Sequence, residues 1–219
     1  MLRRFICDRR ATSAVEFALV LPFLVTLLLG AFELQRLLRH ERRLTLAANT
    51  VAQMLAQRQL SDESPLESDR NSIIQVIPEL TAAFGSRIWE NIAHQITLVA
   101  FRPTVSSCTT SCTYRAHVAQ VWPTSAPGLT VSFADMRRRC GELTRSAAGA
   151  APSHATLPVP FGPGALIVVD LRIAFTPMIG SAWLPPMLLT RQGFASPRFA
   201  RSDFRFPAGQ SNVLTCSGF

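Results

Sequence analysis

The sequence DRRATSAVEFALVLP at residues 8–22 places one carboxylate, Glu16, just inside an apolar run that follows a basic cluster. A charged side chain near the start of a membrane helix costs roughly 2.5 kcal/mol or more unless another group pairs with it. We therefore interpret Glu16 as a functional residue. The alternative is that Glu16 lies at headgroup depth and extends its carboxylate to water without needing a partner.

The apolar run is long enough to cross a bilayer. Every residue from 17 to 32 is apolar or small except Thr26. A helix rises about 1.5 Å per residue, so about 17 to 20 residues span most of a hydrocarbon core roughly 30 Å thick. We predict a basic leader at residues 1–11 and a transmembrane helix at residues 12–33.

A secretory signal peptide is the main alternative, since it also has a basic start and an apolar core. The run is longer than a usual signal core, and it contains Glu16 and Pro22. It also continues into further helix. These features favour a retained anchor.

Residues 34–60 predict a helical stalk that continues the anchor. No Gly or Pro interrupts them, and apolar residues recur at mixed steps of three, four and more. Such a stripe packs either on its own domain or on a partner helix, including that of a second copy. The stripe consists of Leu34, Leu37, Leu38, Leu44, Ala48, Val51 and Leu55.

The remaining residues, 61–219, predict one extracytoplasmic α+β domain. SDESP at 61–65 breaks the helix, and residues 66–84 favour a second helix that Pro78 kinks or ends. Residues 146–164 are rich in Ala, Gly and Pro and indicate a long loop.

The domain is expected to contain an antiparallel sheet. Partial alternation and β-branched or aromatic residues predict strands at 94–103, 113–123, 165–177 and 197–206. The third run is apolar throughout its first half, which favours a central position in the sheet.

The cysteines bear on orientation and compartment. Four of the five follow the anchor, and an even number fits two disulfides in an oxidising compartment. Since Cys7 lies in the leader, this division favours a cytoplasmic N-terminus and a periplasmic or external domain. The basic residues that flank the anchor are nearly balanced and decide less.

Three connectivities exist for four cysteines, and we favour Cys108–Cys112 with Cys140–Cys216. The first pair is local to a turn, whereas the second closes a loop of about 76 residues, which stabilises by roughly 4 kcal/mol in the chain-entropy model. Cys108, Cys112 and His117 also have metal-like spacing, but no fourth ligand is apparent. We expect no metal site.

The charge suits an anionic surface. All 22 basic residues are Arg and the net charge is +8. Aromatic residues are not interleaved with the arginines, so we expect no nucleic-acid partner. The run Arg137, Arg138, Arg139 is interpreted as a solvated face.

No catalytic motif is found. The four histidines are isolated, and no HExxH, phosphate loop, dinucleotide fingerprint or nucleophile elbow occurs. We therefore predict a non-enzymatic protein with no cofactor and no small-molecule substrate. The alternative is a membrane-anchored periplasmic enzyme or binding module whose site the sequence does not reveal.

The string AVEFALVLPFLVTLLLGAFELQRL resembles the start of the TadE-like family of tight-adherence (Tad/Flp) pilus assembly proteins, over about residues 8 to 50. The resemblance implies a pilin-like chain, cut by a prepilin peptidase between Ala11 and Thr12 so that Glu16 becomes the fifth residue. Ala11 stands where a Gly usually precedes the cut, and Phe17 stands where the major pilins carry Tyr. Some members of the family remain uncut and anchored.

The resemblance also implies a role for Glu16 and a set of partners. Glu16 would pair with the freed amino group of Thr12 on a neighbouring subunit and set the register of assembly. The expected function is that of a minor pilin or pilus assembly component in the bacterial inner membrane, with a periplasmic domain or one carried outside in a pilus. The expected partners are other pilin-like and Tad assembly proteins and the peptidase.

Overall fold

The computed structural model describes residues 9–57, 92–124, 138–147, 149–179, 185–197 and 214–216, apart from the side chains of residues 9–12, 123 and 124. The chain divides into two compact units. One comprises Met1–His40 with Thr176–Pro186, and the other comprises Glu41–Phe175 with Met187–Phe219. A long apolar helix, a largely antiparallel sheet and two disulfides confirm the α+β class.

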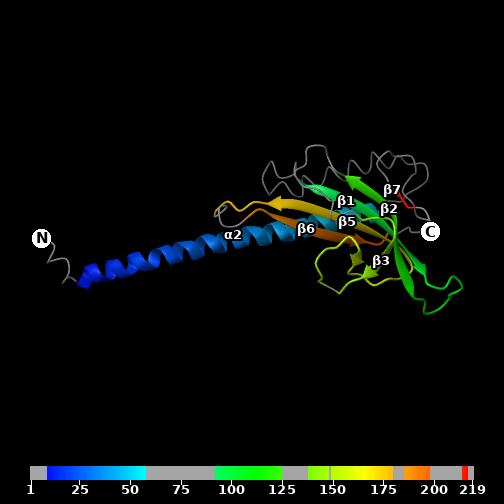
Figure 1. Cartoon of the computed structure of the whole chain (residues 1–219), viewed down its shortest axis with the longest axis horizontal. Helices are drawn as coiled ribbons and strands as arrows, with labels where there is room; N and C mark the ends of the chain where they lie inside the picture. Colours follow the sequence, from blue (N-terminus) through cyan, green and yellow to red (C-terminus); the bar gives the residue numbers. More distant parts are fainter. Residues whose placement is uncertain are drawn as a thin grey trace. The chain divides into compact units, whose positions relative to one another are not determined.

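The helix α2 runs without interruption over Arg9–Gln57 (Figure 1). It contains the predicted transmembrane segment and most of the predicted stalk, while residues 1–8 and 58–60 lie outside the described residues. Leu and Ala, which have high helix propensity, dominate its sequence. Pro22 lies inside the helix and lacks the backbone N–H group that would donate to the preceding turn. A proline inside a helix is tolerated more in membrane helices than in soluble ones.

The strands follow the order β4-β3-β2-β1-β5-β6, with β7 paired to β2. Neighbours are antiparallel except β3 and β4, which are parallel. The bounds are β1 Ala93–Pro103, β2 Tyr114–Thr124, β3 Glu142–Arg145, β4 Thr156–Leu157, β5 Gly164–Phe175, β6 Met187–Ala195 and β7 Leu214–Thr215.

Three of the predicted strands correspond to β1, β2 and β5, and β5 has a neighbour on each side as its apolar run indicated. No strand was predicted at β3 or β6. The segment predicted as a loop at 146–164 contains β4, because Thr156 and Leu157 pair with β3. The predicted break at 61–65, the second helix at 66–84 and nearly all of the predicted strand at 197–206 lie outside the described residues.

One face of the sheet packs on residues 41–57 of α2. The buried helix residues are Leu44, Ala47, Ala48, Val51, Ala52, Leu55 and Ala56. In β6, a Cβ placed on Gly193 would overlap the backbone carbonyl of Ala48 and come within 2.6 Å of the Asn49 nitrogen. Gly193 therefore faces the helix, as does Val169, its partner in β5.

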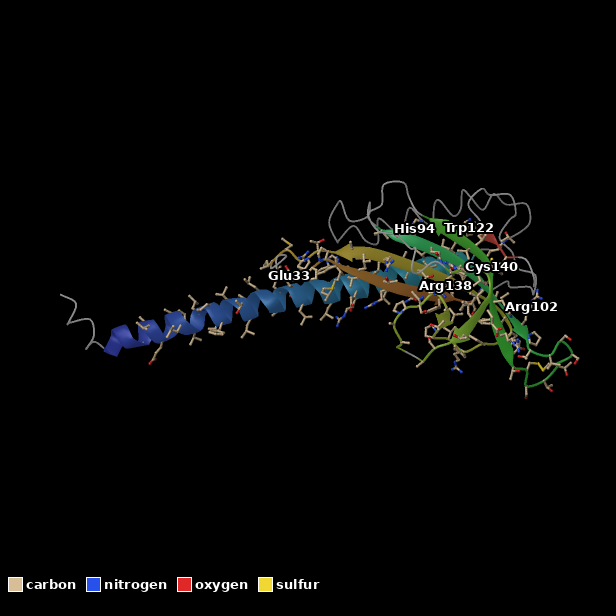
Figure 2. All side chains as sticks on the ribbon, viewed as in Figure 1. Glu33, His94, Arg102, Trp122, Arg138 and Cys140 are labelled. Carbon is tan, nitrogen blue, oxygen red and sulfur yellow. A yellow bond between two sulfur atoms is a disulfide. The ribbon has the colours of Figure 1, made fainter. Side chains whose placement is uncertain are left out.

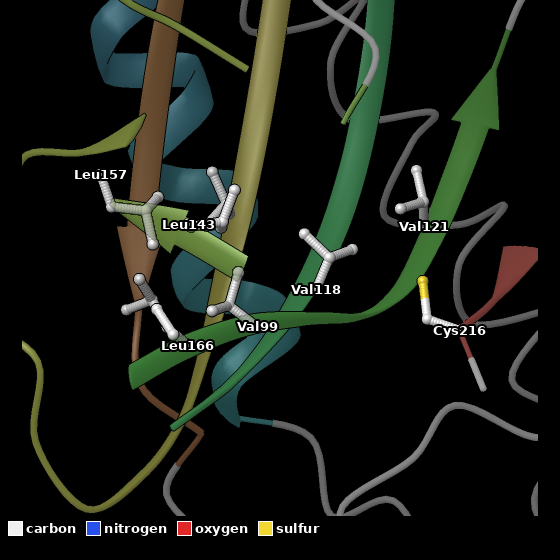
Figure 3. Close-up of a cluster of buried hydrophobic side chains, with 9 residues drawn as sticks. Val99, Val118, Val121, Leu143, Leu157, Leu166 and Cys216 are labelled. Carbon is white, nitrogen blue, oxygen red and sulfur yellow. The ribbon is translucent and has the colours of Figure 1, made fainter. Parts of the chain in front are cut away.

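A second apolar cluster covers part of the opposite face of the sheet (Figure 3). It consists of Val99, Ala116, Val118, Val121, Leu143, Leu157, Leu166, Val168 and Cys216. A register shift leaves Ala119 of β2 without a partner residue in β1, since Leu98 pairs with Gln120 and Val99 with Val118. Such a bulge reverses the alternation of the strand, and it brings Val118 and Val121 to the same face.

Candidate functional site

Residues 13–32 of α2 expose apolar side chains all round the helix. Phe23 is 73% exposed, and the consecutive residues Leu27 and Leu28 are 71% and 70% exposed. Consecutive residues of a helix point about 100° apart, so Leu27 and Leu28 lie on different faces of the helix. Because both are exposed, the apolar residues here do not form one stripe buried against the protein. Within the described residues, one helix is long and apolar enough to cross a membrane, and its most apolar part is not buried inside the protein.

Glu16 lies in the first third of this segment, with its side chain exposed. Thr26, ten positions further along, donates its hydroxyl to the carbonyl of Phe23 at 2.9 Å and so satisfies its polarity within the helix. Glu16 makes no hydrogen bond or ion pair with the described side chains of residues 13–57. Its carboxylate is therefore open to a group from outside the described part of the chain.

The backbone at Ala11 and Thr12 is helical and lies in the first turn of α2. This turn contains no acidic residue to stabilise the positive end of the helix dipole. The first turn of a helix also frays readily, because its N–H groups have no partners within the helix.

Glu33 terminates the apolar segment and carries a set of contacts that the sequence did not reveal (Figure 2). Glu33 is buried, with 7% of the residue exposed. Its Oε1 accepts the backbone N–H groups of Met178 and Ile179, both at 2.9 Å. The Arg36 guanidinium lies 3.0 Å from Oε2. The connection between β5 and β6 is thus bound to the end of the exposed helix.

The two cysteine pairs favoured from the sequence are the ones bonded here. Cys108 is bonded to Cys112 in the loop between β1 and β2, and Cys140 is bonded to Cys216 after β7. The sulfurs of Cys108 and Cys112 are therefore not available as thiolate ligands, and the metal alternative with His117 loses two of its three groups. His94 and His117 lie in β1 and β2.

Arg138 corrects one interpretation of the sequence. Arg139 is exposed as expected of a solvated face, and Arg137 lies outside the described residues. Arg138, which is labelled in Figure 2, is fully buried. Its Nε lies 3.0 Å from Oδ2 of Asp170, and both side chains are 0% exposed. A run of arginines contains no local signal for burial, because the partner carboxylate lies 32 residues away in β5.

The remaining polar contacts of this pair are satisfied within the domain. Gln192 donates to Oδ1 of Asp170 at 2.8 Å, and Arg138 donates to the carbonyls of His154 and Thr156 at 3.2 and 3.4 Å. These donors satisfy the buried carboxylate and fix it in place. We therefore assign the pair a structural role, which is to hold residues 154–156 against the sheet. Among the described residues, no group of three or more His, Cys, Asp or Glu side chains is arranged to bind a metal.

These observations first define a class of protein: an α+β protein with one helix suited to cross a membrane and a disulfide-bridged sheet domain. In the comparison with protein families, the family described as TadE-like protein matches residues 11–53 of the 219-residue chain. The match confirms the resemblance seen in the sequence, and it covers most of α2, including Glu16 and Glu33. No match was found among curated proteins or among solved structures.

Proposed function

We propose that this chain is a minor pilin or pilus assembly component of a Tad/Flp adhesive pilus system. The observation that carries the proposal is that the TadE-like match falls on the one described helix whose apolar surface is exposed on all sides. Such a surface needs lipid or other apolar helices around it, and the family is associated with pilus assembly. The protein acts by protein–protein contact rather than by catalysis.

The proposed location is the bacterial inner membrane, with a single span. Residues before the helix lie in the cytoplasm and the sheet domain lies in the periplasm, or outside the cell if the protein enters a pilus. The two disulfides support this orientation, because disulfides persist in oxidising compartments and are rare in the cytoplasm. The proposed partners are other pilin-like and Tad assembly proteins.

Glu16 is the proposed register residue. A prepilin peptidase would cut between Ala11 and Thr12, which releases an amino group four residues before Glu16. In a neighbouring subunit this amino group is a cation that can pair with the exposed Glu16 carboxylate inside the bilayer. Pairing offsets most of the cost of placing the carboxylate there.

Processing is tested by intact mass and N-terminal sequencing of the protein from membranes of cells with and without the prepilin peptidase. We expect a chain that starts at Thr12 only when the peptidase is present. An uncut chain in both strains would make the protein a fixed assembly factor of the inner membrane. A cut after residue 30 would contradict the anchor itself.

The register role is tested by Glu16→Gln, which keeps the size of the side chain and removes its charge. A hydrogen bond between charged groups contributes about 1.5 to 3 kcal/mol, so we expect about a tenfold loss or more of incorporation into the assembled complex, measured by co-purification with pilin-like partners. Thr26→Ala is the matched control, because its hydroxyl bonds only within its own helix. Unchanged incorporation of Glu16→Gln at normal protein levels would contradict the pairing.

A further inference from the structure

The β5–β6 connection is bound to α2 at the point where the apolar segment ends. Phe32 is the last apolar residue of the segment, and Glu33 follows it directly. Through its two backbone hydrogen bonds, Glu33 holds Met178 and Ile179 at this level of the helix. Both sides of this contact belong to the same compact unit.

The two residues that Glu33 binds, Met178 and Ile179, carry exposed apolar side chains. Met178 is 71% exposed, more than most residues of the exposed helix itself, and Ile179 is 36% exposed. Pro177 precedes them and is buried. We call Met178 and Ile179 the apolar tip. The buried carboxylate of Glu33 therefore holds an exposed apolar tip beside an exposed apolar segment of the helix.

The position of this tip matches the edge of a bilayer. Residues 13–32 rise about 30 Å along the helix, which is the thickness of a hydrocarbon core, so Phe32 lies at its outer boundary when Ser13 lies at the inner one. Arg39 is exposed and follows about 9 Å beyond Glu33, at the depth of the headgroup region. Its positive charge complements the phosphates of the headgroups.

The hydrogen bonds of Glu33 also suit this depth. A backbone N–H group that approaches hydrocarbon has to be satisfied within the protein, since water is not available there. Glu33 satisfies the N–H groups of the two residues at the tip, and Arg36 compensates the charge of its carboxylate.

We propose that Met178 and Ile179 form a second membrane contact, which inserts into the interface of the outer leaflet beside the anchor and is held there by Glu33. The proposal rests on the membrane anchoring in the proposed function. The occupant of this surface is lipid. The contact sets the depth at which the helix leaves the bilayer.

The test uses the full chain in lipid vesicles, with Cys7→Ser as the background and the two disulfides intact. An environment-sensitive fluorophore is attached at Met178→Cys, at Leu27→Cys in the apolar segment, and at Leu46→Cys. Leu46 is 62% exposed and lies 13 positions after Glu33 in the sequence of α2. Quenching is measured with lipids brominated at shallow or deep acyl positions.

We expect the label at residue 178 to be quenched most by shallow bromines, the label at 27 by deep bromines, and the label at 46 by neither. A label at 178 that matches the one at 46, with residue 27 quenched, would overturn the second contact and leave the anchor standing. Protection of residue 178 from water without quenching by lipid would also overturn it, because a protein partner would then cover the tip. No quenching at residue 27 would contradict the anchor and the second contact together.

A second variant tests the role of Glu33. In Glu33→Ala the tip loses its two backbone bonds to the helix, so we expect the quenching at residue 178 to fall by half or more while that at residue 27 is unchanged. Glu41→Ala is the matched control, because Glu41 lies two turns further along α2 and pairs with Arg191 at 2.6 Å instead. Equal quenching at 178 in Glu33→Ala and Glu41→Ala would show that Glu33 does not hold the tip.

Discussion

Gly193 shows how a single missing Cβ controls the packing of the helix on the sheet. The backbone of Ala48 in α2 lies so close to Gly193 in β6 that an added Cβ would overlap its carbonyl. Neither backbone can move alone, because one belongs to a continuous helix and the other is paired with β5 along its length. The space is set by main-chain atoms rather than by a flexible side chain.

We expect Gly193→Ala to lower the free energy of unfolding by about 2 kcal/mol or more, as overpacking of a core typically does. The measurement is urea unfolding of the full chain in detergent micelles, followed by the fluorescence of tryptophan, since Trp122 is buried. Gly162→Ala is the control, because nothing lies within 4 Å of its added Cβ. Equal stability of the two variants would contradict the close approach.

At the scale of the elements, the Arg138–Asp170 pair joins the segment that contains β4 to the central strand β5. Removing one partner of a buried ion pair leaves an uncompensated charge and costs about 3 to 5 kcal/mol. We expect Asp170→Leu to destabilise the domain by this amount and the double variant Arg138→Met, Asp170→Leu to cost clearly less than the sum of the single changes. Chemical unfolding of Asp170→Leu, Arg138→Met and the double variant gives the coupling energy between the two side chains.

The surface pair Arg115 and Glu142 is the control for this comparison of single and double variants. It joins β2 to β3 across 3.8 Å, with side chains 56% and 48% exposed. Exposed pairs contribute little, so Glu142→Gln is expected to change the stability by about 0.5 kcal/mol or less. Strictly additive effects of the changes at Arg138 and Asp170 would show that the buried pair is not coupled.

At the scale of the whole molecule, the two disulfides differ in the length of chain that they close. Cys140–Cys216 spans 76 positions and fixes the end of the two-residue strand β7, whereas Cys108–Cys112 spans 4 positions within one loop. In the chain-entropy model, the longer loop stabilises by about 4 kcal/mol and the shorter by about 2 kcal/mol.

We therefore expect the double variant Cys140→Ser, Cys216→Ser to be less stable than a double variant that lacks the short disulfide. We also expect it to release β7 from β2. Cys108→Ser with Cys112→Ser is the matched comparison. Unfolding by urea gives the two stabilities, and protease cleavage near residue 214 followed by mass spectrometry reports the release of β7. Greater loss of stability from the 108–112 pair would contradict the loop-length argument.

Much of this architecture could be predicted from local patterns. An apolar run of helical length is visible without any partner, and so are alternating strand residues such as those of β1 and β2. The strand β6 was missed because its MLLTRQGFA pattern is mixed, and β4 was missed because two residues form a strand only when β3 is beside them. The bulge at Ala119 likewise depends on the partner strand.

The sequence by itself determined the exposed apolar helix, the position of Glu16 within it, the α+β class and the family resemblance, because each depends on residues that are close together along the chain. Only the tertiary structure decided that Arg138 is buried and that Glu33 binds the tip at Met178 and Ile179. These contacts join residues 32 and 145 or 146 positions apart. No local pattern contains a pairing over such distances, since the fold alone brings the partners together.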